Sequence, residues 1–274
     1  MDPKEIVNIE IDVLLEAIHQ RYDYDFSQYA RASLNRLVHD FLIKENYATP
    51  SQLIPNILYD EDTFDRFLLE LSVTFTEFFR DPSYFNAITE IIFPVLKTYP
   101  FFKIWFAGCA TGEEVYSLAI LLAEANLLKR AKIYATDYNK QAIAIAKSGI
   151  YDAKKIEGKA LAYSNAGGNS VLSHYYTKRH DTIKFNDSLQ NDITFACHNL
   201  VKDSAFGEMH MVICRNVLIY FDQDLKDHTL NLLNNSLSKR GFICLGNKET
   251  LRYSVLHNQY SIISEENKMF RKIN

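Results

Sequence analysis

The chain has 274 residues, enough for one large domain or two modest ones. Hydrophobic residues make up 47%, charged residues 23%, and the formal net charge is −4, which is ordinary for a globular protein and disfavours nucleic acid as a partner. We find no apolar run of the ~20 residues that a membrane-spanning helix needs, and the polar start MDPKEIVNIEID is unlike a signal peptide, so we expect a cytoplasmic protein without membrane insertion.

The first ~90 residues are predicted to be helical, because apolar residues recur at helical spacing. The predicted helices cover IDVLLEAIHQRY, SLNRLVHDFLIKENY, SQLIPNILYD and TFDRFLLELSVTF. Pro55 lies within the third of these segments and is expected to interrupt it. The sequence therefore predicts a small helical domain over residues 1–75.

Strands and helices then alternate. FKIWFAG is a predicted strand followed by the helix GEEVYSLAILLAEANLL, and AKIYATD is a second strand followed by the helix NKQAIAIAKSG. Later strands are expected in ITFACHNL, MHMVICRNVLIYF, GFICLGN, YSIISE and NKMFRKI, with a helix near DLKDHTLNLLNNSL. This alternation predicts a doubly wound, Rossmann-like α/β domain with a parallel sheet over residues 76–274.

The alternation breaks between residues 149 and 192. This stretch holds a Gly-Gly loop, aromatic clusters and one short predicted strand, DTIKF. We interpret it as a small antiparallel β insertion, with a plain loop excursion as the alternative.

The four cysteines, Cys109, Cys197, Cys214 and Cys244, form no CxxC pair and lie in or beside apolar runs. They are expected to be buried thiols. No Cys or acid stands at metal-ligand spacing from the scattered histidines, so no metal site is predicted.

The turn GCATGEE after the first predicted strand is a candidate ligand loop. A phosphate-binding P-loop has a lysine after its last glycine, whereas Gly112 is followed by Glu113 and Glu114. A dinucleotide fingerprint needs GxGxxG, and Ala110 stands at its middle position. Two carboxylates in the first helical turn also disfavour a pyrophosphate, so we expect a cationic or neutral ligand.

Asp137 ends the second predicted strand, where an acid binds ribose hydroxyls in doubly wound sheets. A ligand with a ribose, a cationic tail and no phosphate suits these acids, and S-adenosylmethionine is such a ligand. Glu113 or Glu114 could bind its cationic end, and Asp137 its ribose. Each of the three could instead serve only as a capping or turn residue.

Several segments together identify a family. TFTEFFRDPSYF, IWFAGCATGEEVYSLA, IYATDYNKQAIAIAKSGIY, ITFACHNL, VICRNVLIYFD and LGNKETL occur in this order over about 200 residues. They resemble the chemotaxis receptor methyltransferases, the CheR family. The resemblance implies an S-adenosylmethionine-dependent protein-glutamate O-methyltransferase that methylates chemoreceptors and releases S-adenosylhomocysteine.

The resemblance also implies cofactor contacts. They fall on Thr74, Thr76, Arg80, Glu113 or Glu114, Asp137, Asn199, Leu200, Asn216 and Val217. Thr74 stands where the family often has an asparagine. Asn199 and Asn216 each follow a predicted strand, at the edge where such sheets bind ligands, although either could be a turn residue.

Methyl transfer to a glutamate needs no general base, because a carboxylate with an ordinary pKa near ~4.3 is already ionised. Arg80 is the candidate for orienting a carboxylate through its planar guanidinium, and Tyr220 is a weaker candidate for positioning the acceptor. Phe78 and Phe79 are expected in the core, with cofactor packing as the alternative.

Partner expectations follow from the resemblance. Family members dock helical receptor stalks on a basic face of the helical domain, and some hold a receptor's C-terminal peptide at the β insertion. Here, residues 1–50 carry five Lys and Arg against nine Asp and Glu, so the charge of this region departs from the family pattern at the expected substrate surface. Two alternatives remain open: a non-catalytic adaptor that binds S-adenosylmethionine without turnover, and a nicotinamide oxidoreductase on a similar fold.

Overall fold

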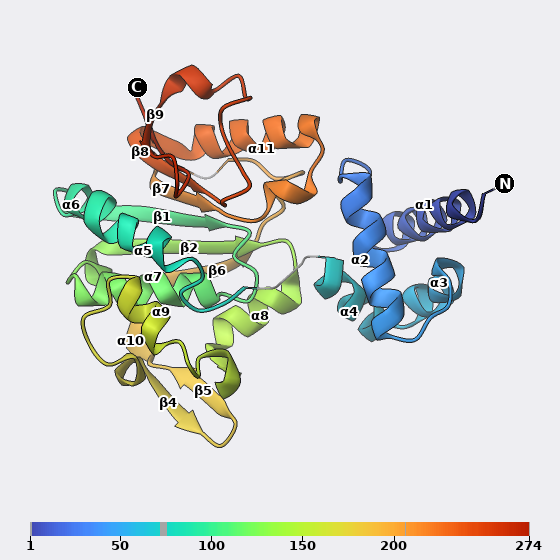
Figure 1. The fold of residues 1–274 in the computed structure, drawn as a ribbon, viewed down its shortest axis with the longest axis horizontal. Coiled ribbons are helices and arrows are strands. Elements are labelled where there is room, and N and C mark those ends of the chain that lie inside the picture. The colour runs from blue at the N-terminus through green and yellow to red at the C-terminus, as the bar shows by residue number, and fades with distance from the viewer. Residues whose placement is uncertain (1, 72–75, 206, 274) are drawn as a thin grey trace. The chain divides into compact units, whose positions relative to one another are not determined.

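A computed structural model describes residues 2–71, 76–205 and 207–273, and it divides the chain into two compact units (Figure 1). The first unit comprises residues 1–74 together with 220–226, and the second comprises the remainder. No helix in the described parts of the chain combines the length and apolar character that crossing a membrane requires. The prediction for Thr74 lies outside the described residues.

The first unit is helical, as predicted. It contains α1 (Pro3–Tyr22), α2 (Arg31–Lys44), α3 (Pro50–Tyr59) and α4 (Glu61–Leu71). Asp2 begins α1 by accepting the Lys4 amide, and Glu5 completes a capping box. The unit closes around buried side chains such as Leu14, Phe41 and Phe67, the last two meeting edge to face at 5.0 Å.

The expected interruption at Pro55 is wrong, because α3 continues through it. A proline inside a helix leaves the carbonyl four residues earlier without its amide donor. Here that carbonyl belongs to Ser51, and both residues are exposed, so water can hydrate the carbonyl.

Residues 220–226 pack with the first unit. Tyr29 and Phe221 form an isolated antiparallel bridge, the Ala30 amide donates to the Tyr220 carbonyl at 2.8 Å, and the Asp222 amide donates to the Gln28 carbonyl at 2.9 Å.

The second unit is built on a seven-stranded sheet in the order β6-β2-β1-β7-β8-β10-β9. The strands are β1 (Phe102–Ala107), β2 (Ala131–Asp137), β6 (Ile193–Cys197), β7 (Met209–Cys214), β8 (Leu237–Leu245), β9 (Tyr260–Ser264) and β10 (Met269–Lys272). β6, β2, β1, β7 and β8 run parallel to one another, whereas β10 is antiparallel to both β8 and β9. The doubly wound prediction is confirmed.

Helices cover both faces of this sheet. The flanking helices are α5 (Pro82–Ala87), a π-helix (Ile88–Ile92), α6 (Phe93–Leu96), α7 (Glu113–Glu124), α8 (Lys140–Ser148) and α11 (Gln223–Ser236). The connections through α7 and α8 lead from β1 toward β6, whereas the connection through α11 leads from β7 to β8 in the opposite direction across the sheet. Because both kinds of crossover are right-handed, α7 and α8 lie on one face of the sheet and α11 on the other (Figure 1).

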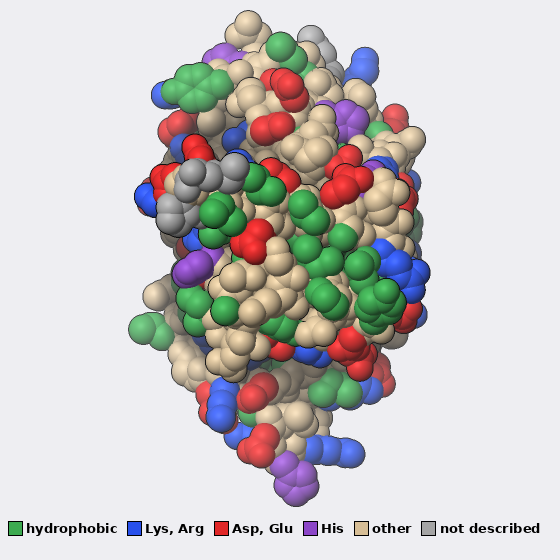
Figure 2. Space-filling view, turned by 90° about the vertical axis from the view of Figure 1, so that its right-hand side faces the viewer, with side chains coloured by type: hydrophobic (Ala, Val, Ile, Leu, Met, Phe, Trp, Pro, Cys, Tyr) green, Lys and Arg blue, Asp and Glu red, His purple; other side chains and the backbone are tan. Residues whose placement is uncertain are grey.

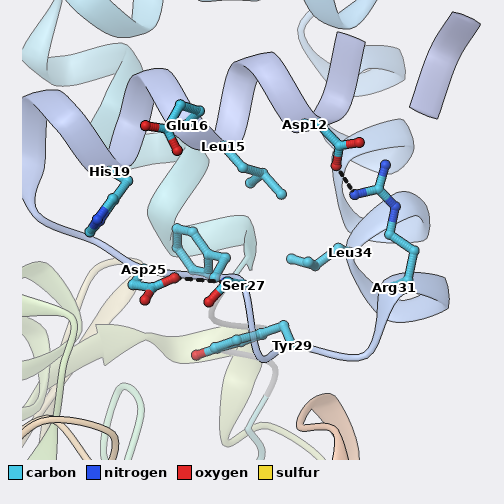
Figure 3. Close-up of a pocket in the computed structure, with 10 residues that line it drawn as sticks. Asp12, Leu15, Glu16, His19, Asp25, Ser27, Tyr29, Arg31 and Leu34 are labelled. Carbon is cyan, nitrogen blue, oxygen red and sulfur yellow. Dashed lines mark hydrogen bonds and ion pairs between the residues drawn. The ribbon is translucent and has the colours of Figure 1, made fainter. Parts of the chain in front are cut away.

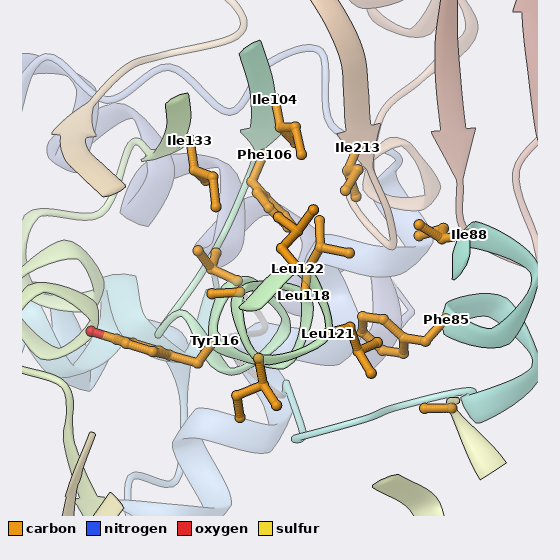
Figure 4. Close-up of a cluster of buried hydrophobic side chains, with 14 of the residues drawn as sticks. Phe85, Ile88, Ile104, Phe106, Tyr116, Leu118, Leu121, Leu122, Ile133 and Ile213 are labelled. Atoms are coloured by element: carbon orange, nitrogen blue, oxygen red, sulfur yellow. The ribbon is translucent and has the colours of Figure 1, made fainter. Parts of the chain in front are cut away.

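The core of this unit forms where α7 packs on β1 and β2. Leu118 and Leu122 of α7 lie against Phe106 and Ile133, all at most 2% exposed (Figure 4). Phe78 and Phe79 are also buried in this core, as expected. The core therefore holds the start of α7, and with it the loop of interest, at the end of β1.

The β insertion is confirmed as a three-stranded antiparallel sheet in the order β3-β5-β4. Its strands are β3 (Ile150–Asp152), β4 (Tyr176–Arg179) and β5 (Thr182–Phe185), accompanied by α9 (Ala160–Asn165) and α10 (Asp187–Gln190). The predicted strand DTIKF corresponds to β5.

All four cysteines are free thiols, and Cys109, Cys214 and Cys244 are buried as expected. The expectation is wrong for Cys197, which is exposed. It ends β6, an outer strand of the sheet, so none of the described strands covers one side of this residue.

Candidate active site

The sheet has a topological switch point between β1 and β7. From β1 the chain moves outward through β2 to β6, and then returns to β7 on the opposite side of β1. The connections leaving the carboxyl ends of β1 and β7 therefore diverge, and doubly wound sheets bind their ligands in the crevice that such divergence opens. The predicted ligand loop and the CRNV segment leave from these two strand ends.

The loop between β1 and α7 is folded tightly onto the end of β2. The amides of Gly108 and Cys109 donate to the Thr136 carbonyl at 2.8 and 2.9 Å. Gly108 has φ +80°, and a Cβ added there would lie 2.5 Å from Cγ2 of Val217. Glycine is thus required both by the backbone conformation and by the close approach of the β7 loop.

Asp137 lies at the centre of this loop cluster and is 6% exposed. One carboxylate oxygen accepts the Ala110 amide at 2.9 Å, and the other accepts the Asn139 amide at 3.0 Å. Burial raises the pKa of Asp137, although the two amides oppose this effect by stabilising the charged form. Each carboxylate oxygen has a second acceptor site, so the same carboxylate can clamp the loops and still accept hydroxyl donors.

The two glutamates that open α7 have different partners. Glu113 is fully buried, accepts the Thr111 hydroxyl at 2.6 Å, and forms an ion pair with Lys155, whose side chain is 45% exposed. Glu114 accepts from the guanidinium of Arg215 at 2.8 Å. The sequence could not rank them, and the structure gives each a distinct environment.

Arg215 is a buried cation that sequence reasoning did not single out. Its side chain is 1% exposed, it donates to Glu114 at 2.8 Å and to Asp81 at 2.6 Å, and its guanidinium carbon lies 3.9 Å from the ring centre of Tyr84. Burial disfavours its charge, but Glu114, Tyr84 and Asp81 together outweigh this effect and raise the pKa of Arg215. The ion pairs join three segments: the FFRD turn, the start of α7 and the loop after β7.

Arg80 lies between two anchored residues. The Phe79 amide donates to the Ser117 hydroxyl of α7 at 2.9 Å, and Asp81 is paired with Arg215. Both anchored residues have positive φ, +55° and +54°, a conformation that non-glycine residues rarely adopt. The strained turn is thus held beside the start of α7, and it carries a half-buried Arg80. Thr76, three residues before this turn, is also half-buried.

Glu249 is the second residue that sequence reasoning missed. It is 5% exposed, and its carboxylate accepts four backbone amides from Asn216, Val217, Leu218 and Gly246, at 3.1, 2.9, 2.8 and 2.6 Å. Burial raises the pKa of Glu249 even though these amides favour its charged form. Asn216 has φ +60°, so the carboxylate fixes a turn that its backbone would otherwise disfavour.

Asn199 and Leu200 follow β6 at the same edge of the sheet. The Asn199 side-chain oxygen accepts the Val201 amide at 2.9 Å, so the turn role left open by the sequence is present. Leu200 is 7% exposed, and the neighbouring His198 amide donates to the Asp137 carbonyl at 3.0 Å. The loop after β6 is therefore attached to the end of β2.

Taken together, the described residues bring Arg80, Glu113, Glu114, Asp137, Asn199, Leu200, Asn216 and Val217 to loops at one edge of the sheet. Tyr220 differs, because it belongs to the first unit. Carboxylates stand where a phosphate-binding loop presents cations, so this edge suits a ligand with hydroxyls and a cationic group better than one with a pyrophosphate.

Comparisons with known proteins find two family models and several relatives that match this chain. The family model described as "CheR methyltransferase, SAM binding domain" matches residues 74–268, and "CheR methyltransferase, all-alpha domain" matches residues 9–72. "Putative methyltransferase Cher3" of Pseudomonas putida is 41% identical over 272 residues, covering 99% of this chain and 100% of that protein. "Chemotaxis protein methyltransferase" of Borreliella burgdorferi is 26% identical and covers 90% of each chain, and the Listeria monocytogenes protein of the same name is 24% identical and covers 83% and 84%.

Proposed function

The chain belongs to the CheR family of S-adenosylmethionine-dependent methyltransferases, and from this premise we propose that it methylates glutamate side chains of chemoreceptors. The products are glutamate methyl esters and S-adenosylhomocysteine. The observation that carries the proposal is the β1–α7 loop at the switch point, where Asp137 and two glutamates replace the cations of a phosphate-binding loop.

When bound, S-adenosylmethionine supplies an activated methyl group on a sulfonium. The acceptor carboxylate is ionised at neutral pH and the departing thioether is neutral, so the protein moves no proton. Its residues have to bind, align and exclude water. A site whose buried acids and arginine hold loops in place fits this requirement for positioning.

Asp137 accepts the ribose hydroxyls in this proposal, since its carboxylate ends β2 beside the glycine loop. Asn199 and Leu200 contact the adenine from the loop after β6, and Asn216 and Val217 contact the cofactor from the loop after β7. Thr74, Thr76 and Arg80 contribute from the FFRD segment.

Between the two glutamates, we assign the cationic end of the cofactor to Glu113. Its partner Lys155 is 45% exposed, so water can solvate the ammonium if a ligand takes its place. Glu114 neutralises Arg215, whose side chain is 1% exposed. If Glu114 bound the cofactor instead, Arg215 would keep only part of its charge compensation in a buried position. Breaking the ion pair of Glu114 is therefore expected to cost more free energy than breaking that of Glu113.

Arg80 orients a carboxylate, either the acceptor's or the cofactor's own. Phe79 is hydrogen-bonded to Ser117 and Asp81 to Arg215, and these bonds hold the backbone of Arg80 in position relative to the start of α7. A guanidinium presents two parallel donors that match a carboxylate. Tyr220 remains a weaker candidate for positioning the acceptor.

The substrate in this proposal is the helical cytoplasmic part of a chemoreceptor, which places the enzyme in the cytoplasm. No strand in the described part of the chain pairs with the outer edge of β4, at Tyr176–Arg179, and in this proposal that edge binds a receptor's C-terminal peptide.

Calorimetric titration with S-adenosylmethionine, S-adenosylhomocysteine and NAD tests the pocket first. Binding of both adenosyl ligands without NAD is expected, and Glu113→Gln should weaken it more than Glu114→Gln. A transfer assay with radiolabelled S-adenosylmethionine and receptor fragments then tests the reaction, with base-labile label expected on glutamate. Binding without transfer to any receptor glutamate would favour the non-catalytic adaptor instead.

A further inference from the structure

The helical unit contains a cavity of about 390 Å³ between α1, α2 and the loop that joins them (Figure 3). Ten residues line it: Asp12, Leu15, Glu16, His19, Asp25, Phe26, Ser27, Tyr29, Arg31 and Leu34. None of them belongs to the candidate active site.

The carboxylates of this cavity outnumber its cations. Arg31 is paired with Asp12 and also donates to the Asn8 carbonyl at 2.7 Å, so its charge is already compensated. Glu16 accepts the side-chain amide of Gln20 at 2.9 Å, and Asp25 accepts the Ser27 amide at 2.8 Å. Because an ionised carboxylate can accept about four hydrogen bonds, the contact with Gln20 does not saturate Glu16.

The walls of the cavity are apolar and aromatic. Phe26 and Leu34 are buried, and Phe26 meets Tyr29 edge to face at 5.2 Å. Nδ1 of His19 is buried and has no hydrogen-bond partner among the described residues, and it is an acceptor when the ring proton lies on Nε2. A carboxylate rim over ring and aliphatic walls suits an arginine or lysine side chain, whose stem is apolar and whose head is a cationic donor.

An exposed apolar row lies beside this cavity on α1. Ile6, Ile9 and Val13 are 47%, 49% and 52% exposed. Ile9 and Val13 are four residues apart, as are Asp12 and Glu16, so the apolar pair and the acidic pair form adjacent rows on the helix. Hydrophobic side chains gather among carboxylates on the face that Figure 2 shows.

The charge of the helical region indicates what covers this surface. Residues 1–74 carry 14 Asp and Glu against six Lys and Arg, a formal net charge of −8, whereas the whole chain carries −4. We infer that the cavity and the adjacent apolar row bind a basic amphipathic helix of a protein partner, with an arginine or lysine side chain in the cavity.

This partner differs in chemistry from a glutamate-bearing receptor surface, because receptor carboxylates would face Asp12, Glu16 and Asp25 here. Binding of a basic helix at this cavity is therefore independent of methyl transfer at the candidate active site.

The test uses the full chain and a synthetic 18-residue helical peptide with leucines on one face and arginines beside them. A second peptide has glutamate in place of every arginine. Fluorescence anisotropy should show binding of the arginine peptide alone, weakening with salt. Glu16→Gln/Asp25→Asn should weaken binding at least about tenfold, since each acid contributes charge-assisted hydrogen bonds.

The matched control is Asp40→Asn/Glu45→Gln, which also removes one aspartate and one glutamate charge, but at the C-terminal end of α2, outside the cavity and not on α1. It should change affinity less than about twofold in 0.15 M salt, where exposed charges beyond ~8 Å are largely screened. Equal weakening by both double variants would overturn the cavity assignment, as would equal binding of both peptides or no binding. Sedimentation showing a wild-type dimer that the cavity variant dissociates would also overturn it, in favour of a second copy of this chain.

Discussion

Replacing Glu249 by glutamine should loosen the loop that carries Asn216 and Val217. One oxygen of Glu249 accepts from Asn216 and Gly246, and the other accepts from Val217 and Leu218. Glutamine keeps one oxygen and places an NH₂ donor against two backbone donors. Two hydrogen bonds to a charged group are worth about 1.5–3 kcal/mol each. Removing a buried charge offsets part of this loss, so we expect a net decrease of about 2–4 kcal/mol in the free energy of unfolding.

Urea denaturation measures this decrease, and calorimetry measures the accompanying loss of affinity for S-adenosylmethionine. Glu265→Gln is the matched control, because the Glu265 side chain is 50% exposed and pairs with Lys268 and Arg252 at the surface. That control should change stability by less than about 1 kcal/mol. A Glu249→Gln protein with wild-type stability and wild-type affinity would refute the claim that this carboxylate holds the loop.

The pH dependence of the same variant provides a signed check. Burial raises the pKa of Glu249 above its ordinary value of about 4.3. Its contribution to stability is therefore greatest below the ordinary pKa and falls as pH rises through the folded-state pKa. The glutamine variant lacks this fall, so the stability advantage of the wild type should narrow as pH rises above the ordinary carboxyl pKa of about 4.3. A widening gap would contradict the assigned direction.

Three further outcomes are expected. Asp137→Ala should weaken S-adenosylmethionine binding, and unchanged calorimetric affinity would exclude the ribose contact. Binding to the wild type should also weaken as pH falls through the raised pKa of Asp137, because protonation removes an acceptor for ribose hydroxyls. Arg80→Ala should lower kcat at saturating S-adenosylmethionine if Arg80 orients the acceptor, whereas a loss confined to cofactor affinity would assign it to the cofactor. Arg215→Met leaves Glu114 and Asp81 without their cation and should lower the free energy of unfolding, measured with urea, by about 3–5 kcal/mol. The exposed control Arg252→Met should lower it by less than about 1 kcal/mol. Equal losses would show that burial adds nothing to the contribution of the Arg215 ion pairs.

Much of the fold was predictable because local patterns and tertiary structure agree. The strand and helix periods after residue 100 predicted β1, α7, β2 and α8 in order, and the break in that rhythm indicated the β insertion. The predictions of a helix interruption at Pro55 and of a buried Cys197 were wrong for related reasons. Whether a proline's lost hydrogen bond is hydrated, and whether a strand is an outer one, depends on neighbours that the local sequence does not contain.

The candidate site divides in a similar way. Asp137 was visible as an acid that ends an apolar strand, and the glutamates of α7 as acids that follow a glycine turn after such a strand. Arg215 and Glu249 carried the same signal, in VICRNV and in LGNKE, but their roles depend on partners far away in the chain. Glu114 lies 101 residues from Arg215, and Glu249 lies 33 residues from Asn216.

By itself, the sequence determined the alternation of elements, the acidic glycine loop and the family, because these depend on residue types at short, regular spacings. Only the tertiary structure decided which acid pairs with which cation, that Glu249 holds the loop after β7, and that a cavity with an acidic rim opens beside α1. These features depend on the order of strands and the packing of helices, which bring together donors and acceptors that no local spacing relates.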